Sequence, residues 1–164
     1  MALGDNTTSV AHGASASGRV PYYIQHELNF ATAVTDKGTA LAAADVIPVL
    51  TIPANTAILG AGFEVTAIHT GTSTDCALDF GLTGGDVDAF VDGFDFDAAA
   101  VGAYSQPAAG TPVVVGGTAD TIDVLIQAQS GTTLTGKLRC WALCMDIDDV
   151  GAVTADEVDR DRLA

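Results

Sequence analysis

The sequence predicts an all-β domain, an antiparallel β-sandwich or jelly roll of about seven or eight strands, on three observations. Short segments rich in β-branched and aromatic residues recur along residues 20–147. Clusters of Gly, Ser, Thr and Asn separate them, and no helical pattern of ten or more residues lies between them. Short strands repeated at this spacing are typical of sandwiches and jelly rolls.

The strands begin where aromatic and β-branched residues start to accumulate. The first three are predicted at residues 22–31, 46–52 and 57–70. The second ends at the turn-forming run Pro53-Ala54-Asn55-Thr56, and the third is long enough that we expect a bend at Gly60 or Gly62.

The later strands are separated by glycine-rich turns. They are predicted at residues 76–82, 113–115, 121–129 and 133–147. In residues 121–129, Ile122, Val124 and Ile126 alternate with polar positions such as Asp123 and Gln127, which predicts one buried and one wet face. Between them, residues 86–94 fit either a helical turn or a loop that presents Phe90 and Phe94 inward, with Asp86 or Asp88 as the cap of the turn.

Two flanking segments differ from this body. Residues 1–19 are small and polar without periodicity, which predicts an arm that is flexible or that becomes ordered against a partner. Residues 148–164 form an acidic tail, in which Thr154 and Glu157 match a capping box and predict a short helix. The expected organisation is therefore an arm, a β-sandwich domain over residues 20–147 and a tail.

Charge excludes several classes of partner. The chain has a formal net charge of −15, and residues 38–136 contain neither lysine nor arginine. Because nucleic-acid binding depends on cations that neutralise phosphates, we expect no nucleic-acid partner. No apolar run approaches the roughly 20 residues that cross a bilayer, and the N-terminus has no signal-peptide pattern, so we expect no membrane partner and synthesis in the cytoplasm.

The three cysteines are predicted to be core side chains. Cys140 and Cys144 lie four residues apart in a predicted strand, which separates them by roughly 13 Å at about 3.3 Å per residue. A disulfide needs Cα atoms about 4.4–6.8 Å apart, so these two do not bridge each other. Cys76 is expected to face the same core from another strand.

No catalytic constellation is present along the sequence. None of the three histidines, His12, His26 and His69, has another His or a Cys at metal-ligand spacing along the chain. Neither a Gly-x-Ser-x-Gly elbow nor a phosphate-binding loop occurs. We therefore expect a protein that is not an enzyme.

The aspartates between residues 86 and 97 are the one cluster along the sequence whose side chains suggest a specific binding site. Calcium is held by carboxylate and carbonyl oxygens, so Asp86, Asp88 and Asp92 are candidate ligands, although their spacing does not match an EF-hand loop. The alternative is a set of solvated loop acids. No other cofactor is predicted.

Aromatic residues and cations supply the candidate contacts with partners. Tyr22, Tyr23, Tyr104 and Trp141 fit either an interface anchor or buried sheet packing. Lys137 and Arg139 are expected to face outward and to pair with acids on a neighbouring strand. We also hypothesise that surfaces with cations contact neighbours, while the acidic middle faces solvent. This hypothesis adds four further residues, which are Arg19, Lys37, Arg160 and Arg162.

Three stretches carry a resemblance to a known group of proteins. They are ADVIPVLTIPANTAILGAGFEVT (residues 44–66), residues 79–81 with 86–94, and residues 119–123 with 136–143. Together they resemble small structural proteins encoded in the head-gene clusters of tailed bacteriophages, particularly marine ones. The arm and the tail are not matched residue by residue.

This resemblance implies a virion structural protein. It implies a capsid decoration, or cement, protein, a β-sandwich unit that is commonly a homotrimer on the outer capsid surface over junctions between major capsid proteins. The alternative is a head-fibre or tail-associated module that binds a receptor or carbohydrate. The expected partners are the major capsid protein and further copies of the chain.

Overall fold

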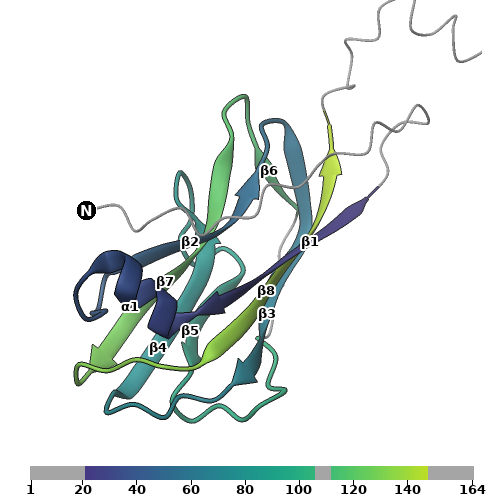
Figure 1. Ribbon diagram of the computed structural model, residues 1–164. Helices are drawn as coiled ribbons and strands as arrows, with labels where there is room; N and C mark the ends of the chain where they lie inside the picture. The colour runs from purple at the N-terminus through teal and green to yellow at the C-terminus, as the bar shows by residue number, and fades with distance from the viewer. Residues whose placement is uncertain (1–20, 106–111, 148–164) are drawn as a thin grey trace, which may run out of the picture.

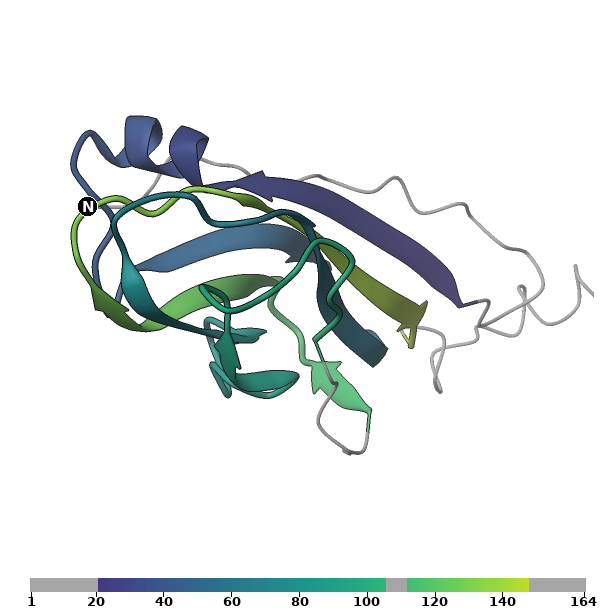
Figure 2. The same ribbon diagram turned by 90° about the horizontal axis from the view of Figure 1, so that it is seen from below.

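Two four-stranded antiparallel sheets pack face to face in a computed structural model of the protein, which describes residues 21–105 and 112–147 (Figures 1 and 2). The elements in chain order are β1 (Tyr22–Asn29), α1 (Phe30–Lys37), β2 (Val46–Ile52), β3 (Thr56–Ala67), β4 (Thr74–Leu82), β5 (Val91–Asp95), β6 (Val113–Val115), β7 (Asp120–Ser130) and β8 (Lys137–Asp146). The all-β prediction is confirmed.

The strand order decides between the two predicted architectures. The first sheet has the order β1-β8-β3-β6 and the second has the order β2-β7-β4-β5. The first strand therefore pairs with the last, the second with the seventh, the third with the sixth and the fourth with the fifth, all antiparallel. This nesting of strand pairs across two sheets is an eight-stranded jelly roll.

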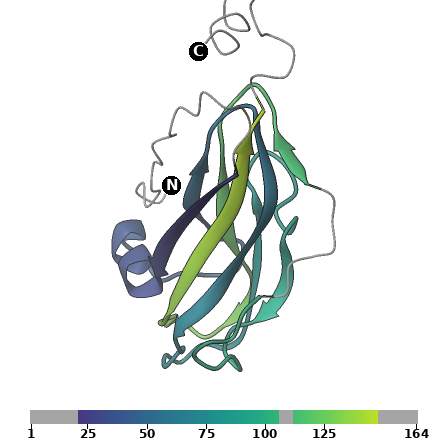
Figure 3. The same ribbon diagram turned by 90° about the vertical axis from the view of Figure 1, so that its right-hand side faces the viewer.

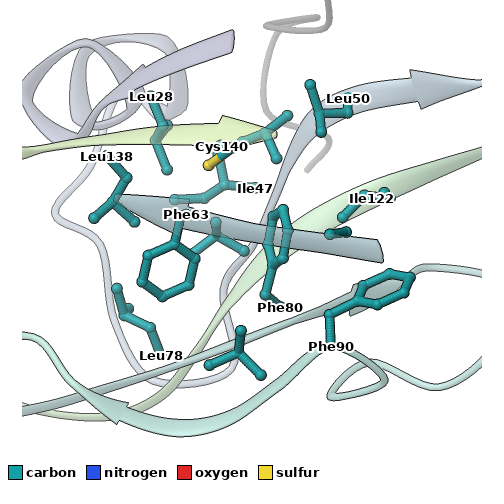
Figure 4. Packing of buried hydrophobic residues seen from close by; sticks show 14 of the residues in the cluster. Leu28, Ile47, Leu50, Phe63, Leu78, Phe80, Phe90, Ile122, Leu138 and Cys140 are labelled. Carbon is teal, nitrogen blue, oxygen red and sulfur yellow. The ribbon is translucent and has the colours of Figure 1, made fainter. Parts of the chain in front are cut away.

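The core fills the space between the two sheets. Phe63 on β3 packs edge-to-face with Phe80 on β4 at a ring-centroid distance of 5.6 Å and with Phe94 on β5 at 4.9 Å. Figure 4 shows the rings of Phe63 and Phe80 among aliphatic side chains from both sheets. Cys140 and Cys144 are buried on one face of β8, and Cys76 on β4 is buried in the same cluster, all three as free thiols. The core assignment of the cysteines is confirmed.

Several predicted strands have the observed bounds and others are shifted. Residues 46–52 and 113–115 coincide with β2 and β6, and β3 changes register between Ile58 and Gly60, at the predicted bend. The loop alternative holds for residues 86–90, where Phe90 is buried. Strand β5 was not predicted, because five residues with two exposed aspartates and a glycine carry no strand pattern.

The prediction that residues 22–31 form one strand is wrong at its end. Asn29 ends β1, and its side-chain Oδ1 accepts a hydrogen bond from the N–H of Ala31 at 3.0 Å, which caps α1. Gly38 ends the helix in the left-handed region with φ of 74°. The helix has eight residues, about two turns, which is too short for an apolar period to show in the sequence.

Asp123 is also placed differently from the prediction. Its side chain points to the outer side of the second sheet, yet the residue is only 4% exposed. On that side the backbone of Asp86 and Val87 lies against Gly81, the partner of Asp123 on β4. A Cβ on Gly81 would lie 2.3 Å from the Asp86 carbonyl oxygen, so only glycine admits this close approach. Thr83 donates its hydroxyl hydrogen to Asp123, and burial raises the pKa of Asp123 to about 6.

The remaining predictions on chain organisation lie outside the described residues. These are the arm over residues 1–19, the tail over residues 148–164 and the short helix within the tail. In the described part of the chain, no helix combines the length and the apolar character needed to cross a membrane.

Candidate interaction face

The outer side of the first sheet gathers most of the predicted contact residues. Side chains alternate along each strand, so Tyr23 and Gln25 on β1, Arg139 and Trp141 on β8 and Glu64 on β3 all point away from the core. Figure 3 shows β1, β8 and β3 side by side, with no described element in front of them. We call the set Tyr23, Gln25, Glu64, Tyr104, Arg139 and Trp141 the aromatic face.

Trp141 lies against the backbone of β3 because that strand carries glycines at this point. A Cβ on Gly62 would lie 3.3 Å from the indole ring and 2.8 Å from Ser105 Oγ. A Cβ on Gly60 would lie 4.0 Å from the same ring. The glycines therefore create the flat surface on which the indole rests.

Tyr104 reaches the face through a short segment that extends the sheet. Ser105 accepts a hydrogen bond from the Phe63 N–H at 2.8 Å through its hydroxyl oxygen, and its own N–H bonds to the Phe63 carbonyl at 2.9 Å. These bonds place Tyr104 opposite Glu64 as an isolated antiparallel bridge. Tyr104 is 61% exposed, so its ring is available for contact.

The aromatic rings form a row across the sheet. Tyr23 stacks on Trp141 with a centroid distance of 6.2 Å and an interplanar angle of 19°. Tyr23 is 54% exposed, and partial burial raises the pKa of its hydroxyl. The six residues of the aromatic face line a shallow depression of about 330 Å³. Such a combination of aromatic rings with a few polar groups fits a contact or binding surface.

Two ion pairs neutralise the acids on this side of the sheet. Lys137 Nζ lies 2.7 Å from Glu27 Oε1, and Arg139 Nη1 lies 3.2 Å from Glu64 Oε2. The hydrogen bond from Lys137 lowers the pKa of Glu27. The prediction that Lys137 and Arg139 face outward and pair with acids on neighbouring strands is confirmed.

Other predicted contact residues do not join the aromatic face. Tyr22 alternates with Tyr23, so its ring points to the other side of β1 and packs against the core, where burial raises the pKa of its hydroxyl. Lys37 ends α1 and forms an ion pair with Asp45. Arg19, Arg160 and Arg162 lie outside the described residues.

The candidate calcium ligands lie on the other sheet and its loops. Asp86 and Asp88 are neighbours in the turn after β4, where a hydrogen bond shared with Asp86 raises the pKa of Asp88. Asp92 lies on β5 and accepts a hydrogen bond from Gln127 at 3.4 Å. Within residues 21–105 and 112–147, no group of three or more His, Cys, Asp or Glu side chains is arranged to hold a metal ion.

His69 takes part in connecting two turns. Its Nδ1 accepts a hydrogen bond from the Thr135 N–H at 3.1 Å, and its Nε2 lies 2.9 Å from the carbonyl oxygen of Ser73. Its ring also packs against Phe96. These contacts join the β3–β4 turn to the β7–β8 turn, which is a structural role.

Sequence reasoning did not name four contributors to the aromatic face, which are Gln25, Glu64, Gly62 and Ser105. The glycines at positions 60 and 62 were a usable signal, because a glycine inside a strand often marks a close approach by another group. No sequence pattern marks Ser105, since its partner Phe63 lies 42 residues away.

The comparisons with known proteins concern the fold. No family model matches the sequence, and no curated protein matches it. A chain in the capsid asymmetric unit of cyanophage Pam1 is 14% identical, with a TM-score of 0.57 over 85% of this chain and 94% of that chain. A chain in the capsid of Ralstonia phage GP4 is 14% identical, with a TM-score of 0.58 over 87% of this chain and 93% of that chain. The fold of this protein is therefore a jelly roll that also occurs in phage capsids, as the resemblance in sequence led us to expect.

Proposed function

We propose that this protein is a structural, non-catalytic component of a phage particle, a decoration or cement protein on the outer surface of the head. The observation that carries the proposal is the jelly roll, which aligns over nearly the whole length of chains from two phage capsid structures. In this proposal the partners are the major capsid protein and further copies of the chain in a homotrimer.

The physical properties of the chain support such a role. A high net negative charge keeps a protein soluble before assembly. Many copies on one particle multiply weak contacts into strong attachment. We propose that residues 1–19 and the tail add contacts to the shell or to neighbouring copies, because segments that become ordered on binding can cover a large surface.

The distribution of charge suggests an orientation on the head. Strands β2, β4, β5 and β7 of the second sheet contain six aspartates and no cation, whereas β8 of the first sheet carries Lys137 and Arg139. We propose that the first sheet faces neighbouring proteins and the second sheet faces solvent. A map of the particle with the second sheet against the shell would contradict this orientation.

The proposal is tested by adding the purified full-length protein to phage heads that lack it. We expect the protein to sediment with the heads, to appear on their outer surface in cryo-electron micrographs and to raise the temperature at which the heads open. A variant without residues 1–19 is expected to bind more weakly. Failure of the full-length protein to bind heads would contradict the cement role.

A second candidate function is a carbohydrate- or receptor-binding module on a head fibre or tail. The aromatic face favours it, because the exposed rings of Tyr23 and Tyr104 and the polar groups of Gln25, Glu64 and Arg139 surround one depression. A glycan array would show a signal that Tyr104→Ala removes and Val87→Ala, a change in a loop of the other sheet, leaves unchanged. No signal with the wild type would reject this candidate.

A further inference from the structure

We infer that the aromatic face is the surface through which one copy of this chain binds a second copy. The inference rests on the proposed function, in which several copies assemble on a head, and names the surface by which they meet. Three properties of the described residues carry it: the apolar exposure of this face, its charge balance and its capacity to complement itself.

The apolar exposure is concentrated on one side of one sheet. Nine large hydrophobic residues are exposed in the described part of the chain, and five of them lie on the outer side of the first sheet or at its edge. They are Tyr23, Leu59, Tyr104, Val114 and Leu143. Trp141 and Met145 lie half-buried on the same side of β8. An exposed apolar patch of this kind marks a contact surface.

The distribution of charge favours a second copy of this chain as the partner that binds the aromatic face. Each copy has a net charge of −15, so two copies repel each other over most of their surfaces. On the first sheet, Glu27 and Glu64 are each paired with a cation, which leaves the aromatic face without net charge. The strands of the second sheet carry no cation, and four of their six aspartates are not buried, which are Asp75, Asp92, Asp95 and Asp120. Two such acidic chains therefore approach each other at least cost through the first sheet.

The face also complements itself in charge. The side chain of Arg139 is 50% exposed and donates one hydrogen bond, from Nη1, to Glu64. A guanidinium group has five N–H donors, so Arg139 keeps donors for the Glu64 of a second copy. An acidic patch or a basic patch on an unrelated partner would match only half of this ion pair.

The face complements itself in shape as well. Leu143 lies opposite Tyr23 in the β1–β8 ladder, at the end of the depression, and Leu59 lies at the register shift of β3 beside it. Val114 is exposed further along the same sheet, opposite Ala57. One copy can supply these projecting side chains while the next copy supplies the depression. A contact of this kind buries the exposed rings and excludes water from the ion pairs at its edge.

The test is the oligomeric state of the full-length protein in solution, without phage heads. The variant Tyr23→Glu/Tyr104→Glu adds two negative charges at side chains that are 54% and 61% exposed, so neither change is made in the core. The matched control is Val46→Glu/Val87→Glu, which adds the same charge at exposed apolar side chains away from the aromatic face. Circular dichroism and the unfolding temperature verify that each variant is folded.

Sedimentation velocity over a range of protein concentrations gives the result. We expect the wild type and the control to form the same oligomer, and the face variant to sediment as a single chain or to need at least about tenfold more protein to assemble. A wild type that is a single chain at all concentrations, or a face variant that assembles like the control, would overturn the inference.

Binding to phage heads is measured separately, so that the two proposals fail in different ways. A single-chain wild type that binds heads rejects the self-contact and leaves the cement role intact. An oligomeric wild type that binds no heads rejects the cement role and leaves the self-contact intact. Glycan binding that Tyr104→Glu removes, in a wild type that is a single chain, would assign the face to a sugar and overturn the inference.

Discussion

Single residues set local properties that neither the strands nor the topology determine. Asp123 is the clearest case, because its carboxyl group is 4% exposed and its Oδ1 has no hydrogen-bond partner. Burial of a carboxylate with an unpartnered oxygen is unfavourable, since water no longer solvates the charge. At Gly62 the absence of a side chain is the property that matters, because the space is taken by Trp141 and Ser105.

We expect Asp123→Asn to stabilise the protein near neutral pH by about 1–3 kcal/mol, because the amide avoids the cost of a buried charge and still accepts the hydrogen bond from Thr83. Burial raises the pKa of Asp123 from 3.8 to about 6. The wild type therefore matches the variant below pH 3.8 and loses stability relative to it as the pH rises through about 6. Urea unfolding between about pH 4 and pH 7.5 measures this difference.

Asp97→Asn is expected to change the pH dependence of stability in the opposite direction to Asp123→Asn. The Cys76 N–H donates a hydrogen bond to Asp97 Oδ1 at 2.6 Å and lowers the pKa of that carboxyl group. The stabilisation by Asp97 is present above its ordinary pKa and is lost as the pH falls. A variant at Asp123 whose stability varies with pH in parallel with the wild type would show that Asp123 is not buried as a charged group.

Gly62→Ala is expected to destabilise the protein by about 1–3 kcal/mol, because the added Cβ would lie 2.8 Å from Ser105 Oγ and 3.3 Å from the indole of Trp141. Trp141 is the single tryptophan of the chain, so its fluorescence should report the displaced ring. Gly116→Ala is the matched control, since a Cβ added there would have no other atom within 4 Å and no change is expected. Equal unfolding temperatures for the two variants would refute the contact.

At the scale of elements, local signals located most strands but not their neighbours. The strands at residues 46–52 and 113–115 were predicted with the observed bounds, because proline, asparagine and glycine mark their ends. The helix α1 was missed although Asn29 and Gly38 carry its cap signals, since Thr and Val within it also suit a strand. Tertiary packing of Phe30 and Ala33 into the core decides in favour of the helix.

Asn29→Ala should lower the stability of the protein by about 1 kcal/mol, because it removes the acceptor for the Ala31 N–H at the start of α1. Asn29→Asp keeps an acceptor at the same place and is expected to retain most of the stability. Chemical denaturation with the helix signal in circular dichroism measures both variants. The same loss in both would mean that Asn29 acts through β1 and not through the cap.

At the scale of the whole molecule, the nested strand pairing brings distant segments onto one face. The aromatic face combines side chains from β1, β3 and β8 with Tyr104 from the segment that bridges to Glu64. The same topology separates charge, since the cations of the described strands lie on the first sheet and six aspartates lie on the second. The aromatic face and the aspartate-bearing strands therefore lie on different sheets of the jelly roll.

The net charge predicts that salt stabilises the isolated protein. Fifteen excess negative charges repel one another in the folded state, and salt screens this repulsion over shorter distances as its concentration rises. We expect the unfolding temperature to rise by about 2–8 °C between low salt and about 0.5 M NaCl, which corresponds to roughly 1–2 kcal/mol in a domain of this size. Calorimetry with NaCl and KCl in parallel separates screening from ion-specific binding. A fall with either salt would show that intrachain ion pairs outweigh the repulsion.

Local sequence patterns were sufficient for the all-β class, the positions of most strands, the buried state of the cysteines and the outward pairing of Lys137 and Arg139. These properties depend on side-chain alternation and turn residues, which act over a few positions along the chain. The jelly-roll order, the burial of Asp123 and the meeting of Tyr23, Trp141 and Tyr104 on one face emerged only from the three-dimensional arrangement. Strand partners such as β1 and β8 come from opposite ends of the folded domain, and no local pattern encodes which strands pair across such distances.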